Sequence, residues 1–250
     1  MREIIYGIHP IQAILERDPQ RLLDVYLLKG RDDLRLQLLI QQLEKAGISF
    51  QMVSRQWLDK KSEGAVHQGI VGCVQARRPF QEADLPALLP QKESPLLLVL
   101  DGITDPHNLG ACLRCAAAAG VHAVIIPENR AVSLNATAKK VASGAAEIVP
   151  LIRVKNLARS LCLLQEHNVW IVGTAGEENH HLYQSQLTGP LALVVGAEGK
   201  GIRRLTRMYC DELISIPMAF GVVLSLNVSV AAGVCLFEAV RQRLYQKITL

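Results

Sequence analysis

The sequence has few aromatic residues, little net charge and no long apolar run. Its 250 residues include four Phe, two Trp and five Tyr, so the core must be built from aliphatic side chains, which favours α/β packing. Lys and Arg outnumber Asp and Glu by only 27 to 23, too small an excess to coat a nucleic acid by bulk charge. Any nucleic-acid contact must therefore come from local basic surfaces, for which 139–140, 153–159 and 200–207 are candidates. A hydrophobic fraction of 50% excludes a largely disordered chain.

Targeting and metal-binding signals are also scarce. The first ten residues, MREIIYGIHP, carry two early charges and no apolar core, and no apolar run approaches the length of a bilayer span. The six cysteines are scattered along the chain, as expected for reduced thiols in a packed interior. Cys112 and Cys115 have redox or zinc spacing, but no second pair or set of histidines accompanies them, so we expect them to pack within a helix. The sequence predicts a cytoplasmic protein with no membrane segment and no metal.

The composition changes at one place along the chain. Residues 75–95, QARRPFQEADLPALLPQKESP, contain four prolines and several charges and show neither helical nor strand periodicity. Such a segment is typical of a linker. We therefore predict a small domain over 1–75, a linker over 76–95 and a larger domain over 96–250.

Strand-like and helical segments alternate on both sides of this linker. Before it we predict strands at EIIYG, LDVYLLK, ISFQMV and GIVGCV, with helices around 10–17 and 33–46. After it the strand-like runs are LLLVLD, HAVIIP, EIVPLI, VWIVGT, LALVVG and DELISIP. This order predicts an α/β protein whose larger domain has a mainly parallel sheet. Ligand sites of such sheets lie in loops at the carboxyl ends of the strands.

The first such loop, DGITDPHNLGACLR over 101–114, leaves a buried strand and enters an alanine-rich helix. We expect Asp105 to cap this helix and Pro106 to occupy its first turn. Asn108 and Arg114 are separated by about 9 Å of helical rise. They converge only if the arginine side chain points back toward the N-terminus of the helix. A solvent-facing arginine is the simpler alternative.

Two further loops combine small residues with isolated polar groups. Over 191–201, LALVVGAEGKG, an apolar strand leads into three glycines and Glu198. This pattern indicates either a nucleotide-like ligand or a solvated turn, and neither the phosphate-loop nor the dinucleotide fingerprint is present. Over 214–233 we expect Ser225 to cap a helix of small residues, while the polar side chain of Asn227 needs a partner.

Together, NLGACLR, LVVGAEGKGI, IPM and SLNVSVA resemble the three motifs of the SpoU/TrmH-type RNA 2'-O-methyltransferases of the SPOUT superfamily. YGIHPIQAILE and SEGAVHQGIV are similar to the N-terminal RNA substrate-binding module of that family, which has a ribosomal L30e-type fold. The resemblance covers nearly the whole chain. It implies a parallel sheet with a C-terminal trefoil knot, which general topology rules would not predict. It also implies a homodimer whose active site takes residues from both subunits.

The resemblance further implies methyl transfer from S-adenosyl-L-methionine to a ribose 2'-hydroxyl, with a guanosine in the peptidyl-transferase P-loop of 23S rRNA as substrate. The implied catalytic positions are Arg114, Asn108, Glu198, Ser225 and Asn227, and the implied cofactor-binding positions are Gly196, Ile216 and Leu226. Arg114 matches the residue often proposed as the base. Because a guanidinium stays charged and only donates, stabilisation of the developing alkoxide is easier to defend.

One segment departs from the family pattern. Phe220 stands as an insertion before Gly221, and apolar residues occupy 222–224 in place of polar ones. This predicts either a bulged cofactor loop or weaker cofactor binding. A noncatalytic RNA-binding homologue therefore stays open as an alternative. A transfer-RNA methyltransferase of the same family is another, although the extended N-terminal module favours ribosomal RNA. A dinucleotide-dependent oxidoreductase is a third, which the missing glycine fingerprint disfavours.

Overall fold

The computed structural model describes residues 2–31, 33–89, 94–219 and 225–248. The chain divides into two compact units. The first unit comprises Met1–Arg78 together with Ser143–Ile148, and the second comprises Pro79–Ala142 and Val149–Leu250. The first unit thus includes one short segment from the second half of the sequence.

The first unit is a four-stranded sheet with its main helices on one face. Its strands are β1 (Arg2–Tyr6), β2 (Leu22–Leu28), β3 (Phe50–Val53) and β4 (Ile70–Gln75), in the order β1-β4-β2-β3. Its helices are α1 (Ile8–Arg17), η1 (Pro19–Arg21), α2 (Leu34–Lys45), α3 (Arg55–Lys61) and α7 (Ala145–Ile148). Apolar side chains of α1 and α2 form the core with one sheet face. The predicted small α/β module is confirmed.

The segment 143–148 joins this unit through an ion pair and a close backbone contact. Arg21 is only 7% exposed; its Nη1 lies 3.3 Å from Oε2 of Glu147, and its Nε donates to the carbonyl oxygen of Gln75. A Cβ on Gly144 would lie 2.8 Å from the carbonyl oxygen of His9. Both contacts join residues far apart in sequence.

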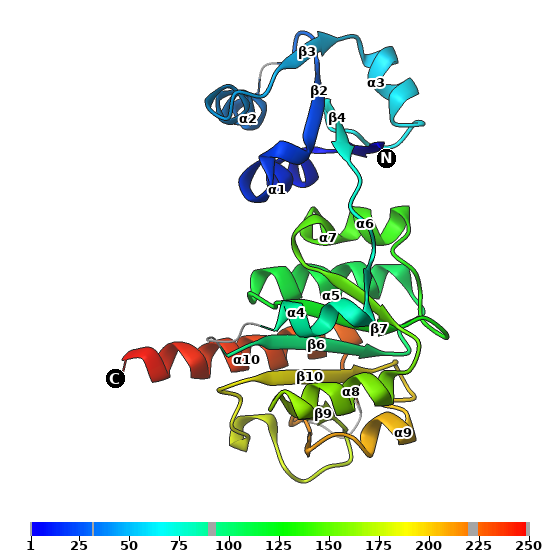
Figure 1. The fold of residues 1–250 in the computed structure, drawn as a ribbon, viewed down its shortest axis with the longest axis vertical. Coiled ribbons are helices and arrows are strands. Elements are labelled where there is room, and N and C mark those ends of the chain that lie inside the picture. The colour runs from blue at the N-terminus through cyan, green and yellow to red at the C-terminus, as the bar shows by residue number, and fades with distance from the viewer. Residues whose placement is uncertain (1, 32, 90–93, 220–224, 249–250) are drawn as a thin grey trace. The chain divides into compact units, whose positions relative to one another are not determined.

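The second unit is a seven-stranded sheet with helices on both faces. Its strands are β5 (Phe80–Gln81), β6 (Leu96–Asp101), β7 (Ala123–Pro127), β8 (Leu151–Val154), β9 (Trp170–Thr174), β10 (Leu191–Gly196) and β11 (Glu212–Ile214), in the order β11-β9-β10-β6-β7-β8-β5. All neighbouring pairs are parallel. Figure 1 shows β6 and β10 side by side in this sheet. The predicted α/β class with a parallel sheet is confirmed.

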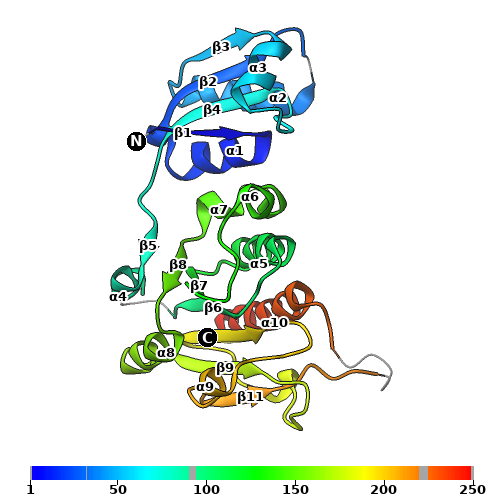
Figure 2. The ribbon, with the colours of Figure 1, turned by 90° about the vertical axis from the view of Figure 1, so that its right-hand side faces the viewer.

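The helices form a layer on each side of this sheet. Helices α5 (Pro106–Ala118) and α10 (Val228–Ile248) lie on one side, and α4 (Leu85–Leu88) and α8 (Leu157–Glu166) on the other (Figure 2). The remaining helical segments are η2 (Glu82–Asp84), α6 (Ala136–Ala142), η3 (Leu182–Gln184) and α9 (Arg204–Arg207). Because both faces are covered, β6 and β7 are buried at every position. This burial explains their uninterrupted apolar sequences.

One predicted strand, EIVPLI over 147–152, is partly wrong. Its first residues end helix α7, and β8 begins only at Leu151. Pro150 has no N–H to donate to a strand ladder, which disfavours a strand through this position. In addition, the ion pair with Arg21 holds Glu147 in the first unit.

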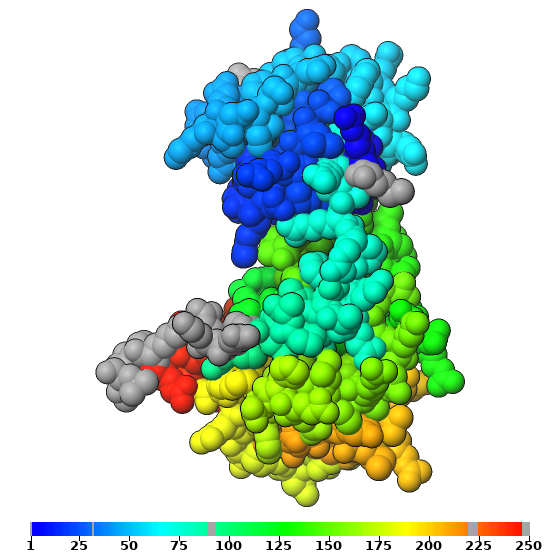
Figure 3. All heavy atoms as spheres, in the orientation of Figure 1, coloured from blue at the N-terminus to red at the C-terminus, as the bar shows by residue number. Residues whose placement is uncertain are grey.

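Residues 79–89 belong to the second unit and pack at the edge of its sheet. Phe80 and Gln81 pair with β8 as an edge strand, and Leu85 is fully buried. The space-filling view in Figure 3 shows this segment, in cyan, directly against α8. Elements of two to four residues are too short to produce a readable period, which is why the sequence shows only a linker composition here.

The cysteines behave as packing residues in the described structure. Cys112 is fully buried on α5, and the Sγ of Cys115 lies 3.8 Å from the carbonyl oxygen of Ser229 on α10. Burial raises the pKa of the Cys112 and Cys235 thiols to about 12. The predicted helix-packing role of the Cys112 and Cys115 pair is confirmed. Within the described ranges no helix is long and apolar enough to cross a membrane, and no three His, Cys, Asp or Glu side chains cluster as a metal site.

Candidate active site

Helix α5 follows β6 after a loop of four residues and carries the first two predicted site residues. The carboxylate of Asp105 caps the helix and Pro106 is its first residue, so both local predictions are confirmed. Asn108 lies in the first turn. At Gly110 an added Cβ would lie 2.6 Å from the carbonyl oxygen of Ala138. This glycine therefore allows α6, rather than a ligand, to approach the backbone of α5.

The loop after β10 turns back on itself, which explains its glycines. The N–H of Gly201 donates to the carbonyl oxygen of Ala197 at 2.8 Å, and Gly199 and Gly201 have φ of 72° and 62°. A Cβ on Gly196 would lie 2.0 Å from the carbonyl carbon of Gly201. The turn itself therefore requires these glycines, and it carries the exposed side chain of Glu198.

A buried carboxylate anchors the end of this loop. Asp101 is the last residue of β6, and its side chain is fully buried. It accepts hydrogen bonds from the main-chain N–H of Arg203 at 2.9 Å and from the Nε of the same residue at 2.5 Å. Sequence reasoning missed this pair. An Asp that ends an otherwise apolar strand was the available signal, because a buried carboxylate needs donors.

Side chains from three separate segments meet in one hydrogen-bonded cluster, formed by Asn108, Glu198 and Asn227 and called here the polar triad. Oε1 of Glu198 accepts from Nδ2 of Asn108 at 3.1 Å and from Nδ2 of Asn227 at 2.5 Å. Nδ2 of Asn227 also donates to Oδ1 of Asn108 at 2.9 Å. The N–H of Val228, at the start of α10, lies 3.4 Å from the same Glu198 oxygen. A carboxylate in this place is stabilised by the helix dipole.

Asn227, and not Ser225, caps helix α10. Oδ1 of Asn227 accepts from the N–H of Ser229 at 2.9 Å and from its hydroxyl at 2.6 Å. The prediction that Ser225 is the cap is therefore wrong. Helix α10 starts at Val228, so the cap position falls two residues later, and Asn fills it as well as Ser does. Ser225 is exposed and lies in an irregular segment.

Arg114 lies on α5 outside the polar triad. Its side chain is exposed, and its guanidinium makes no hydrogen bond or ion pair with any described residue. The next residue, Cys115, contacts Ser229 in the first turn of α10. Arg114 thus presents a positive charge that no described residue neutralises, on a helix that contacts the first turn of α10 through Cys115.

The predicted cofactor positions fall where strands end or helices begin. Gly196 ends β10, Ile216 follows β11, and Leu226 precedes the cap residue Asn227. Ile216 and Leu226 are partly exposed and belong to no helix or strand. The hydrogen bond from Asn227 to Glu198 places Leu226 near the loop that Gly196 begins. The predicted insertion at Phe220 and the altered positions 222–224 lie outside the described residues.

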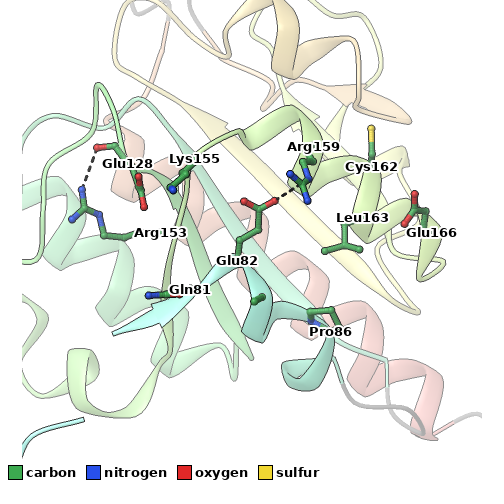
Figure 4. A pocket seen from close by; sticks show the side chains of 11 residues that line it. Gln81, Glu82, Pro86, Glu128, Arg153, Lys155, Arg159, Cys162, Leu163 and Glu166 are labelled. Atoms are coloured by element: carbon green, nitrogen blue, oxygen red, sulfur yellow. Dashed lines mark hydrogen bonds and ion pairs between the residues drawn. The ribbon is translucent and has the colours of Figure 1, made fainter. Parts of the chain in front are cut away.

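A charged cavity of about 670 Å³ lies elsewhere on the second unit, between the segment 79–89 and α8. It is shown in Figure 4, and none of the predicted site residues lines it. Its charged lining residues are Glu82, Glu128, Arg153, Lys155, Arg159 and Glu166. Because acidic and basic groups occur in equal number, the basic surface expected at 153–159 is largely balanced. The polar triad therefore remains the candidate active site.

Comparison with known sequences assigns the class. The family model described as SpoU rRNA Methylase family matches residues 95–237, and the model described as RNA 2'-O ribose methyltransferase substrate binding matches residues 4–80. The chain belongs to the SpoU rRNA methylase family. The resemblance seen in the sequence motifs is thus confirmed, and the protein is an RNA methyltransferase.

Individual relatives match over nearly the full length. Proteins named 23S rRNA (guanosine-2'-O-)-methyltransferase RlmB are 72% identical in Yersinia pestis, over 97% of this chain and 98% of the relative, and 67% identical in Escherichia coli K12, over 97% and 100%. Among solved structures, the SpoU methyltransferase AviRb from Streptomyces viridochromogenes has a TM-score of 0.77 at 23% identity, covering 98% of this chain and 91% of that one. AviRb has also been solved in complex with AdoMet.

The loop after β10 leads to a first prediction. We expect Gly196→Ala to lower the free energy of unfolding by about 3 kcal/mol, because the new methyl group overlaps the Gly201 backbone. Gly199→Ala is the control, since no atom lies within 4 Å of its added Cβ and only its positive φ is strained, at about 1 kcal/mol. Urea unfolding measures both values. Equal losses in the two variants would show that the close approach at Gly196 is absent.

Proposed function

We propose that the protein transfers a methyl group from S-adenosyl-L-methionine to the 2'-hydroxyl of a guanosine ribose in 23S rRNA. The observation that carries this proposal is the polar triad, which lies at the carboxyl ends of a parallel sheet. Helix α5, which carries Asn108, also carries the exposed Arg114, whose guanidinium pairs with no described residue. The choice of 23S rRNA as substrate is supported by the relatives that match over nearly the full length and are named for this activity.

We propose that Gly196, Ile216 and Leu226 hold the cofactor. An adenine ring needs apolar contacts on its faces and main-chain donors and acceptors at its edge. Ile216 and Leu226 offer partly exposed apolar side chains in irregular segments, and Gly196 presents main-chain groups at a strand end. These residues fit the cofactor, which supplies an electrophilic methyl group when bound. The AdoMet complex of AviRb, which shares the fold, is in agreement.

The polar triad has hydrogen-bonding capacity left for a substrate. Asn227 uses both its amide groups within the protein, so it holds the other two side chains in place. Asn108 uses one of its two Nδ2 hydrogens, and Glu198 uses one carboxylate oxygen. The second hydrogen of Asn108 and Oε2 of Glu198 therefore remain to orient the ribose. Ser225 lies at the exposed rim two residues before Asn227.

Arg114 supplies the charge that the reaction needs. The 2'-hydroxyl would have to be held in line with the methyl group that the cofactor supplies, and its proton would pass to solvent water as its oxygen accepts the methyl group. An arginine that donates to this oxygen stabilises the negative charge that develops on it. The guanidinium of Arg114 meets no described acid that would neutralise it. We therefore assign electrostatic stabilisation, and not proton abstraction, to Arg114.

Glu198→Ala is expected to lower the turnover number by at least about tenfold, because both asparagines lose the acceptor that orients them. Its effect on stability is expected to be only about 1 kcal/mol, since the lost hydrogen bonds are exposed. Turnover is measured with both substrates saturating, and stability by urea unfolding. Glu166→Ala, which removes an exposed carboxylate from α8, is the control. Unchanged turnover in Glu198→Ala would remove this residue from the mechanism.

We propose that two copies of the chain associate through α10. Val230, Phe237 and Leu244 are 49%, 50% and 57% exposed, and their spacing of seven residues places them on one face of the helix. Exposed apolar side chains repeated along one helix face, here with the exposed Arg241 between the last two, are typical of an interaction surface. The stripe begins at Val230, about one helical turn after Asn227 of the polar triad. A second copy would therefore bring residues close to the active site.

Phe237→Asp is expected to shift the protein from dimer to monomer, because a charge at the centre of the stripe must be desolvated in the interface. Sedimentation equilibrium at micromolar concentration measures the mass. Val66→Asp, at an exposed apolar position of the first unit, is the control and should leave the mass unchanged. A wild-type protein that is monomeric under these conditions would contradict the dimer.

The division of labour along the chain is also part of the proposal. We assign RNA contacts to residues 1–75, a connecting role to 76–95 and methyl transfer to 96–250, within the cytoplasm. The substrate-binding family model, which spans residues 4–80, supports the first assignment. The trefoil knot stays a prediction, because part of the C-terminal segment, 220–224, lies outside the described residues.

Labelled S-adenosyl-L-methionine tests the proposed activity. Incorporation into unmodified 23S rRNA, with none into unmodified transfer RNA, is the expected result. Incorporation into transfer RNA alone would favour the other branch of the family. No incorporation into either RNA, despite RNA binding, would indicate a noncatalytic RNA-binding homologue.

A further inference from the structure

The first unit carries a partly exposed aromatic pair between β2 and α3. The ring centroids of Tyr26 and Trp57 are 4.3 Å apart with an interplanar angle of 41°. Trp57 is 36% exposed, and Nζ of Lys61 lies 5.9 Å from the centroid of its ring. We call Tyr26, Trp57 and Lys61, with Arg55 and Lys60 on the same helix, the aromatic–basic patch.

The fold of α3 does not require an aromatic residue at position 57. The hydroxyl of Ser54 accepts the main-chain N–H of Trp57 at 3.3 Å and caps the helix, whatever side chain follows. Leu58 is fully buried and supplies the apolar contact that fixes the helix to the sheet. The indole of Trp57 therefore lies beside the core contact and remains partly open to solvent.

The charges around this indole are positive. Arg55, Lys60 and Lys61 are exposed, and none of them forms an ion pair with a described residue. Asp59, the carboxylate on the same helix, accepts from Nε2 of the buried His67 at 2.9 Å. The acid of α3 is thus engaged on the protein, while its basic groups are available to an anion.

We propose that the aromatic–basic patch binds an unpaired nucleotide of the RNA substrate. Nζ of Lys61 lies over the Trp57 ring at a cation–π separation of 5.9 Å from the centroid, so a base that stacks on this face displaces the ammonium. The ammonium of Lys61 then pairs with the adjacent phosphate. Sequence-specific recognition of RNA typically uses such splayed bases stacked on aromatic side chains. With a single exposed indole, the patch selects one nucleotide and not an extended single strand.

This inference rests on the proposed function for the identity of the RNA, but its first test does not need catalysis. The chain has two tryptophans, so Trp170→Phe leaves Trp57 as the single indole and Trp57→Phe leaves Trp170. Trp170 is 49% exposed in the second unit, which makes it a matched reference. Each variant is titrated with an unmodified 23S rRNA transcript while tryptophan emission is recorded.

Stacking is expected to quench the emission of the Trp170→Phe protein much more than that of the Trp57→Phe protein. Equal quenching, or none, would overturn the proposal. Circular dichroism shows whether each variant is folded. Both variants keep Leu58, which fixes α3 to the sheet. Quenching of Trp57 by a ribosomal protein, with none by RNA, would identify a protein partner and also overturn the proposal.

The second test uses binding and catalysis together. Trp57→Ala is expected to weaken RNA binding by about tenfold or more, which corresponds to the loss of one stacked base. Lys61→Ala is expected to lower the slope of the logarithm of the RNA-binding constant against the logarithm of the salt concentration by about one, because one phosphate contact is lost. Lys45→Ala, an exposed lysine on α2, is the control. In each patch variant KM for RNA should rise while kcat at saturating RNA stays unchanged.

These outcomes separate the two proposals. If the wild-type protein binds RNA and quenches Trp57 but transfers no methyl group, the proposed function fails and the patch stands. If methyl transfer occurs and Trp57→Ala leaves KM for RNA unchanged, the patch fails and the proposed function stands.

Discussion

Replacement of Arg114 with alanine is expected to lower methyl transfer by at least about 100-fold, the usual cost of removing one donor to a developing oxyanion. The residue is exposed on α5 and makes no hydrogen bond or ion pair with a described residue, so the fold does not depend on it. Its unfolding midpoint should therefore match that of the wild type. A loss of rate without a loss of stability distinguishes a functional arginine from a solvent-facing one.

The measurement is single-turnover methyl transfer with both substrates saturating, with urea unfolding alongside. Arg159→Ala is the control, because Arg159 is an exposed arginine of the same unit that lines the charged cavity away from the polar triad. Arg114→Lys keeps the charge but loses the planar donor fork, so an intermediate rate is expected. Full activity in Arg114→Ala would remove this residue from the mechanism.

Asp101→Ala is expected to lower the free energy of unfolding by about 3 kcal/mol, the low end of the cost of breaking a buried ion pair, because Arg203 is partly exposed. The substitution leaves the main-chain N–H of Arg203 without its acceptor and frees the end of the loop that carries Glu198. Methyl transfer should fall as well, since Glu198 then no longer holds the polar triad in one arrangement.

A double-mutant cycle tests this pair directly. Arg203→Ala leaves the Asp101 carboxylate buried with only the main-chain N–H of residue 203 as a described donor, so it should cost at least as much stability as Asp101→Ala. The double variant should cost clearly less than the sum of the two, because each single change already breaks the same contact. Additive losses, measured by urea unfolding, would show that the two side chains are not coupled.

The local predictions from sequence succeeded where a rule involves neighbouring residues. Asp105 caps α5 and Pro106 begins it, as the short-range pattern predicts. The strand-like runs at 96–101 and 191–196 appear as the central pair of the parallel sheet. Ser225 and Asn227 are both good capping residues and lie only two positions apart. Local rules therefore could not decide which of them caps α10, and the structure shows that Asn227 does.

The features that sequence reasoning missed depend on residues far apart. Asp101 and Arg203 are separated by 102 positions, and Arg21 and Glu147 by 126. The periodicity of apolar residues gives no sign of such pairs, because it depends only on residues within one helix or strand. The polar triad was selected because its motifs resemble a family, and spacing alone would not have joined Asn108 to Glu198 across 90 positions. The strand order, in which β9 separates β10 from β11, is equally invisible to pattern analysis.

Nucleoside mass spectrometry of the reacted RNA tests the central claim most directly. Unmodified 23S rRNA and unmodified transfer RNA are each incubated with the protein and S-adenosyl-L-methionine, then digested to nucleosides and to mapped fragments. The account predicts 2'-O-methylguanosine at a single position of 23S rRNA, and its loss with Arg114→Ala. A methyl group found on a base, on another nucleoside or on transfer RNA alone, or no methyl group at all, would contradict it.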